Sequence, residues 1–98
     1  MIATFVTFRY EGSFDEAKIR KIAEGARGRF EGMPDLRSKV FTVRPEKKEA
    51  VNVYVWDTEQ AAKQFFTKEV LEMVTGLYGV RPTIEHAPVA ALVENRHS

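Results

Sequence analysis

The fold of this chain is decided by residues 36–56, which read LRSKVFTVRPEKKEAVNVYVW. The segments Leu36 to Arg44 and Ala50 to Trp56 are rich in β-branched and aromatic residues, which favour strands. The residues between them, Pro45 to Glu49, form a short polar connection typical of an antiparallel hairpin. The sequence therefore predicts two paired strands in the middle of the chain.

A further strand and a long helix are predicted before this hairpin. Apolar, threonine and aromatic residues dominate Ile2 to Tyr10 without a helical period, which indicates a strand. A helix is expected from Phe14 to Glu31, because Ser13 and Glu16 have the spacing of a capping box. Gly32 stands where a glycine commonly ends a helix.

The part of the chain after the hairpin is predicted to contain helix and then strand. Asp57 opens a second capping pattern, and residues 67–68 are candidates for an interruption of the helix that follows. The helical pattern ends at Gly79, and a last strand is expected from Thr83 to Val93. Residues 94–98 are expected to form a frayed tail.

The predicted order of elements is β, α, β, β, α, β, which favours an α+β fold of the ferredoxin-like kind. Crossover rules give a four-stranded antiparallel sheet with both helices on one face. No repeat, low-complexity segment or linker divides the sequence, so residues 1–98 are expected to form a single domain.

The sheet face away from the helices would then be bare and apolar. We expect it to carry Phe5, Phe41, Tyr54 and Trp56, a larger exposed patch than monomers usually tolerate. The sequence therefore predicts a homodimer in which the open sheet faces of two subunits pack together and form a barrel.

Composition excludes several classes of function. The chain has 15 Lys and Arg against 14 Asp and Glu, with the signs interspersed, so nucleic acid is not expected as a partner. It has no cysteine, which excludes disulfides, thiolate metal sites and a cysteine nucleophile. No apolar stretch approaches the ~18 residues of a membrane span, and the first residues lack the pattern of a leader peptide. We therefore expect a cytoplasmic protein without membrane contact.

The third predicted strand carries the most informative pattern for function. Valines at positions 51, 53 and 55 alternate with Asn52, Tyr54 and Trp56. We expect the valines to face the helices and the other three side chains to line a cavity on the opposite face. An amide both donates and accepts, so Asn52 suits the support of an oxyanion. Plain interface packing of the aromatic side chains is the alternative interpretation.

The same cavity is expected to receive side chains from the neighbouring strands. Lys39 is either a side chain that extends to solvent at the mouth or, if buried near Asn52, a support for a substrate anion with a lowered pKa. Arg9 has the same two interpretations. The residues expected to bind substrate are Tyr54, Lys39, Phe41, Phe5, Thr7 and Arg9.

Three segments resemble the dimeric α+β barrel superfamily, in particular the small bacterial proteins related to the antibiotic biosynthesis monooxygenases. They are residues 36–39, 52–62 and 78–82. The cofactor-independent, quinone-forming members have an Asn and a Trp two pleats apart on the third strand, as Asn52 and Trp56 are here. The resemblance implies that these two residues are catalytic. It also implies that Asn52 holds the substrate's oxygen while a substrate anion activates dioxygen without metal or flavin.

The haem-degrading members of the same superfamily differ from this sequence. They pair such a Trp with an Asn on the first strand and a His ten residues after the Trp, where this chain has Thr4 or Thr7 and Phe66. His86 stands without partners and is interpreted as a sheet residue rather than a ligand. We therefore expect no metal and no cofactor. Glu85 is either a base or a solvent-facing residue.

Three functions fit these patterns. The first is a cofactor-independent monooxygenase that acts on a small aromatic or polyketide-like substrate in the barrel cavity. The second is a ligand-binding or sensing module that uses the same cavity without catalysis. The third is a structural dimer whose sheet faces pack dry.

Overall fold

The structure is a computed structural model that describes residues 1–95, so the end of the predicted frayed tail, residues 96–98, lies outside the described residues. The described elements confirm the predicted alternation of strands and helices, with the second helical region divided in two. In chain order they are β1 (Ile2–Arg9), α1 (Glu16–Phe30), β2 (Leu36–Arg44), the 3-10 turn η1 (Pro45–Lys47), β3 (Glu49–Trp56), α2 (Glu59–Phe65), α3 (Lys68–Tyr78) and β4 (Thr83–Pro88).

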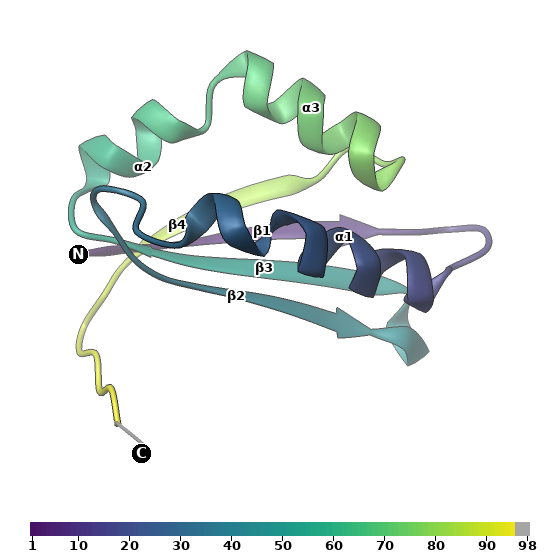
Figure 1. Cartoon of the computed structure of the whole chain (residues 1–98), viewed down its shortest axis with the longest axis horizontal. Coiled ribbons are helices and arrows are strands. Elements are labelled where there is room, and N and C mark those ends of the chain that lie inside the picture. Colours follow the sequence, from purple (N-terminus) through teal and green to yellow (C-terminus); the bar gives the residue numbers. More distant parts are fainter. Residues whose placement is uncertain (96–98) are drawn as a thin grey trace.

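The strands form one antiparallel sheet in the order β2-β3-β1-β4. All helices cover the same face of this sheet, and the other face is uncovered (Figure 1). Helix α1 lies over β2, whereas α2 contacts β1 and β3. The ferredoxin-like α+β fold predicted from the sequence is therefore confirmed.

The β2–β3 hairpin closes as the sequence predicts, with one irregularity. Lys48 adopts a left-handed conformation (φ 53°), and its N–H donates to the carbonyl of Pro45 at 3.1 Å. A register shift between Leu36 and Ser38 inserts an extra residue at the start of β2. That residue, Arg37, points outward and forms an ion pair of 2.9 Å with Asp57.

Both helix starts differ from the predicted caps. Helix α1 is capped by Asp15, whose carboxylate accepts from the N–H of Lys18 at 3.1 Å, rather than by Ser13. A carboxylate at this position also interacts favourably with the positive end of the helix dipole. Helix α2 is capped by Thr58 instead of Asp57, because the Asp57 carboxylate is held by Arg37.

The predicted interruption is confirmed, but the last strand is shorter than expected. Thr67 caps α3 with its hydroxyl, which accepts from the N–H of Val70, and Gly79 ends α3 at φ 83°. Strand β4 ends at Pro88, opposite Ile2, instead of at Val93. The N–H of Val89 still donates to the carbonyl of Met1 at 3.2 Å, and residues 90–95 then leave the sheet (Figure 1).

The buried core lies between the sheet and the helices, and the predicted assignment of the two sheet faces is wrong. Asn52, Tyr54 and Trp56 are buried on the helix side, while the valines of β3 lie on the open face. The large aromatic side chains bury more apolar area than valines, and the helices supply Phe30, Phe65 and Phe66 as their partners.

The open face remains apolar, but most of its residues are not the expected ones. Of the four aromatic residues predicted there, only Phe5 lies on it, because Phe41 packs on the helix side against Phe30. Phe5 is 36% exposed and Val40 is 53% exposed. The residues of the apolar patch on this face, called the open-face patch below, are Ala3, Phe5, Val40, Val51, Val53 and Val55.

Candidate functional site

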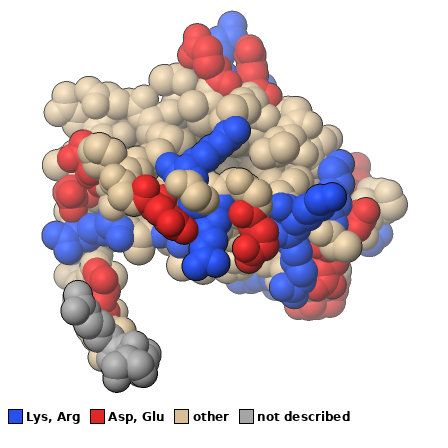
Figure 2. Space-filling view, viewed as in Figure 1, with Lys and Arg blue, Asp and Glu red and all other residues tan. Residues whose placement is uncertain are grey.

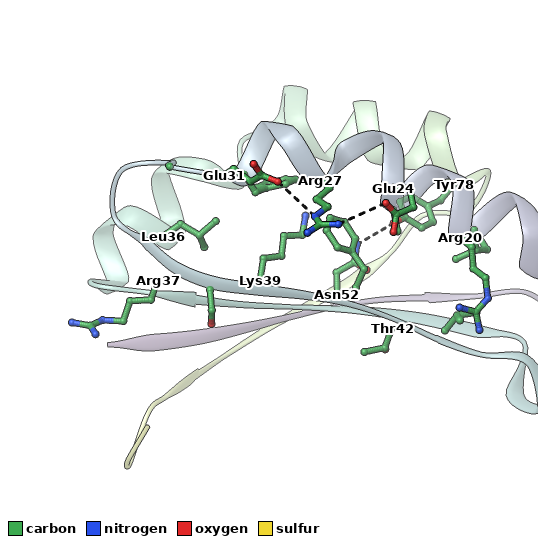
Figure 3. A pocket seen from close by; sticks show the side chains of 17 residues that line it. Arg20, Glu24, Arg27, Glu31, Leu36, Arg37, Lys39, Thr42, Asn52 and Tyr78 are labelled. Carbon is green, nitrogen blue, oxygen red and sulfur yellow. Dashed lines mark hydrogen bonds and ion pairs between the residues drawn. The ribbon is translucent and has the colours of Figure 1, made fainter. Parts of the chain in front are cut away.

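A groove of about 990 Å³ lies between α1 and the β2 edge of the sheet, on the helix side (Figure 3). Strands β2 and β3 supply Lys39, Phe41 and Asn52 to its floor, and α1 supplies Phe30 to its wall. The side chain of Tyr78, the last residue of α3, also lines it. This hollow, called the α1–β2 groove below, therefore brings together residues from both layers of the fold.

Asn52 is held in the groove by Tyr78. The Asn52 side chain is 5% exposed, and its Nδ2 donates to the Tyr78 hydroxyl at 3.1 Å. The Tyr78 ring stacks on Phe8 with a centroid distance of 3.7 Å, and the Tyr10 hydroxyl donates to the Tyr78 carbonyl at 2.6 Å. Both contacts fix Tyr78 and therefore fix the direction of the Asn52 amide.

Tyr78 was missed as a site residue in the sequence. In the sequence Tyr78 marks the end of a helix, because Gly79 follows it, and begins one of the three segments of the resemblance. Its spacing from Leu71 and Val74 would have placed it on the buried stripe of that helix. A tyrosine on the buried side of a helix needs a hydrogen-bond partner for its hydroxyl. This position is therefore the sequence signal that could have identified Tyr78 as a site residue.

Lys39 lies in a cage of aromatic rings. Its Nζ donates to the Tyr54 hydroxyl at 2.8 Å. The same Nζ lies 3.4 Å from the centre of the Phe30 ring, 4.2 Å from that of Tyr54 and 4.3 Å from that of Phe41. Burial lowers the pKa of Lys39 to about 7, because the ammonium loses hydration. The ring faces favour the ammonium and oppose part of this effect.

The two tyrosines of the site remain protonated at neutral pH. Burial raises the pKa of Tyr54, and the nearby Tyr78 adds to this shift. Burial also raises the pKa of Tyr78, although the hydrogen bond from Asn52 offsets part of the effect. Both hydroxyls therefore keep a hydrogen that they can donate.

Trp56 belongs to an aromatic cluster beside the groove rather than to the groove lining. Its ring stacks on Tyr54 at 5.6 Å with an angle of 6° between the planes, and Phe65 and Phe66 pack around the pair. Trp56 is 2% exposed. Within residues 1–95, its indole Nε1 is a buried donor without a hydrogen-bond partner, at a cost of roughly 1–3 kcal/mol. Asn52 and Trp56 thus share a sheet face without lining one hollow.

A row of polar side chains crosses the helix side of the sheet in register. Lys39 is opposite Tyr54, Tyr54 is opposite Thr4, and Thr4 is opposite His86. The Thr4 hydroxyl and His86 Nδ1 are 2.8 Å apart. This row places His86 at the β4 edge, across the sheet from the groove. Glu85 lies on the open face, opposite Phe5.

Phe5, Thr7 and Arg9 do not join the site, contrary to the predicted cavity. Alternation along β1 places them on the face opposite Thr4, Val6 and Phe8, away from Asn52, although Thr7 is itself buried. Arg9 forms an ion pair of 2.9 Å with Glu49. The structure therefore brings Asn52, Tyr54, Lys39 and Phe41 together and separates these three residues from them.

Charged side chains at the mouth of the groove pair with one another. Arg27 of α1 lies 4.0 Å from Glu24 and 3.6 Å from Glu31, the residue that follows the helix (Figure 3). Acidic and basic residues are interspersed over the face seen in Figure 2. In the part of the chain that the structure describes, no cluster of three or more acidic or histidine residues could hold a metal. No helix there is long and apolar enough to cross a membrane.

The fold and the groove define a ferredoxin-like α+β protein with a polar hollow between its sheet and its helices. No family model matches the sequence, and no curated protein matches it. Solved structures do match. A monooxygenase from the gene ActVA-Orf6 of Streptomyces coelicolor, in complex with nanaomycin D, has a TM-score of 0.68 and 22% identity. The match covers 96% of this chain and 92% of that one.

A second similar structure is SnoaB from Streptomyces nogalater, described as a cofactor-independent oxygenase. Its TM-score is 0.61 and its identity 19%, over 96% of this chain and 98% of that one. The resemblance to antibiotic biosynthesis monooxygenases, predicted from three segments of sequence, is thus confirmed at the level of the fold.

Proposed function

We propose that this chain is a cofactor-independent monooxygenase that oxidises a small aromatic or polyketide-like compound in the α1–β2 groove. The observation that carries the proposal is the buried amide of Asn52, fixed by Tyr78 and lining the same hollow as the caged amine of Lys39. The fold shared with two oxygenases supports it.

In this proposal the protein binds and stabilises a substrate anion. Asn52 Nδ2 has a second hydrogen beside the one given to Tyr78, so it can donate to the substrate's oxygen. The Lys39 ammonium compensates the negative charge, and Phe30 and Phe41 contact the substrate's ring. The bound anion supplies the electrons that dioxygen receives. Fixed donors of this kind stabilise an oxyanion without reorganising during the reaction.

Trp56 has a supporting role in the proposed site. Its stacking on Tyr54 holds the phenol that accepts from Lys39.

We further propose that the protein is a cytoplasmic homodimer formed through the open-face patch. Phe5 and Val40 are exposed there, and a second copy of the sheet would cover them. Light scattering is expected to give twice 11.2 kDa at micromolar concentration.

Ligand binding without catalysis is the second candidate function. It is favoured by the separation of Trp56 from the groove, because the Asn and Trp pair implied by the resemblance does not line one hollow here. A monooxygenase would consume oxygen in the presence of its substrate, whereas a binding module would not.

Oxygen uptake with hydroxynaphthalenes and quinols tests the proposal. The purified protein is expected to consume oxygen with at least one of them, and Asn52→Ala is expected to slow it. The matched control is Gln64→Ala, which removes an exposed amide from α2. Ligand binding without oxygen uptake would favour the binding module.

A further inference from the structure

We propose that Lys39 is the proton acceptor of the α1–β2 groove. Its uncharged amine takes the proton of a bound aromatic hydroxyl, so the groove selects hydroxyaromatic compounds and holds them as anions. This inference rests on the proposed function and assigns the substrate class of the same site.

The position of Lys39 supports this role. Lys39 pairs with Tyr54 across the β2–β3 hairpin, and Asn52 is the next residue along β3 with the same orientation. Amine and amide therefore line one hollow from adjacent strands (Figure 3). The Tyr54 hydroxyl and three rings hold the amine in place, so little side-chain entropy is lost when a substrate binds.

The protonation state of Lys39 also fits the role. Burial lowers the pKa of Lys39 to about 7, so a large share of the molecules carries a free lone pair at neutral pH. The other titratable or charged side chains facing the groove are those of Tyr54, Tyr78, Arg20, Glu24, Arg27, Glu31 and Arg37. Glu24 and Glu31 are exposed and lie close to Arg27, so solvent and this guanidinium screen their effect on the amine.

The proposed step moves one proton and no electrons. The O–H bond of the substrate breaks, an N–H bond forms at Nζ, and the electron pair stays on the substrate's oxygen. The new ammonium lies over the faces of Phe30, Phe41 and Tyr54, where ring quadrupoles stabilise it. The new anion accepts a hydrogen bond from the second N–H of the Asn52 amide, and its charge is compensated by the ammonium.

The acidity of the ligand's hydroxyl determines whether it can transfer its proton to Lys39. A phenol like that of tyrosine has a pKa of about 10, roughly three units above that of the Lys39 amine. An ion pair in the partly dehydrated groove offsets a gap of this size. An aliphatic hydroxyl is a far weaker acid and would keep its proton. The rings of Phe30 and Phe41 in the lining add a preference for aromatic compounds.

The first test uses 4-chlorophenol, an ordinary weakly acidic phenol whose phenolate and phenol absorb at different wavelengths. At a pH above 7, where the Lys39 amine is mostly uncharged, but below the pKa of the free probe, wild-type protein is expected to raise the phenolate-to-phenol ratio of the bound probe by about tenfold, equivalent to one pKa unit. Lys39→Met is expected to bind the probe without this rise. The control Lys21→Met, at an exposed lysine of α1, should behave as wild type. Equal phenolate formation in Lys39→Met, or no binding to wild type, overturns the proposal.

A second test needs no substitution, because loss of Lys39 could disturb the aromatic cage. With ¹⁵N-labelled lysine at about pH 8, where the Lys39 amine is mostly uncharged and free 4-chlorophenol still carries its proton, addition of 4-chlorophenol is expected to shift the Lys39 Nζ resonance to that of an ammonium. The control 4-chloroanisole, which has no hydroxyl, leaves the resonance unchanged. The same response to both compounds overturns the inference. Oxygen uptake without proton transfer rejects only the role of Lys39, and proton transfer without oxygen uptake rejects only the monooxygenase.

Discussion

The amine of Lys39 on β2 and the phenol of Tyr54 on β3 are directly opposite in the hairpin and joined by a hydrogen bond of 2.8 Å. Both are covered by the helices, so a cation and a phenol share the part of the molecule where charge is costly. Burial lowers the pKa of the amine and raises that of the phenol, and both shifts favour the neutral form of the group. The pair is therefore sensitive to pH in a way that exposed lysines are not.

The stability of the protein is expected to increase as pH rises from about 7 toward 10.5. The pKa of Lys39 is lowered from 10.5 to about 7 in the folded state, so in this window the unfolded chain binds a proton that the folded chain does not. The free energy of unfolding should then rise by at most ~1.4 kcal/mol per pH unit, less solvent screening of a partly exposed amine. Urea unfolding of wild type and Lys39→Met at several pH values checks this, and parallel pH curves would contradict it.

Asn52→Ala is expected to affect both rate and stability. Loss of an oxyanion donor should cost roughly 3 kcal/mol of barrier, or ~100-fold in rate. The lost hydrogen bond to Tyr78 adds a decrease of ~1 kcal/mol in the free energy of unfolding. Oxygen uptake and urea unfolding measure the two effects. A variant with unchanged rate would remove Asn52 from the proposed site.

Two substitutions of Trp56 are expected to differ in kind. Trp56→Ala leaves a large cavity in the aromatic cluster, so the free energy of unfolding should fall by ~3–5 kcal/mol. Trp56→Phe keeps a ring against Tyr54 and removes the unpaired N–H, so its cost should be clearly smaller. Thermal unfolding compares the two. Equal losses would show that the stacking on Tyr54 contributes little.

Val53→Lys is expected to dissociate the proposed homodimer. Val53 lies opposite Phe5 and Val40 in the middle of the open-face patch, so a charge there would be buried without a partner in the dimer. Light scattering should shift toward 11.2 kDa, while Glu85→Gln on the same face keeps the dimer. A wild-type protein that stays folded as a monomer on dilution would reject the dimer itself.

Local signals explain why the elements were predictable. Gly79 and the Thr67 cap act within a few residues, so the helix ends and the break between α2 and α3 are encoded where they occur. The hairpin is equally local. The end of β4 is not, because it depends on where β1 begins, far away in the sequence.

The sequence by itself determined which side chains share a face within β1 and β3, because alternation along a regular strand is a property of the backbone; in β2 the extra residue Arg37 interrupts the alternation. It grouped Asn52, Tyr54 and Trp56 correctly. Alternation has no preferred side, so only the packing of Phe30, Phe65 and Phe66 from the helices decided which face is buried. The register of β1 against β3 likewise placed Phe5 away from Asn52. Tertiary structure alone brought Tyr78 to the Asn52 amide, since the two residues come from separate elements that meet only in the folded core.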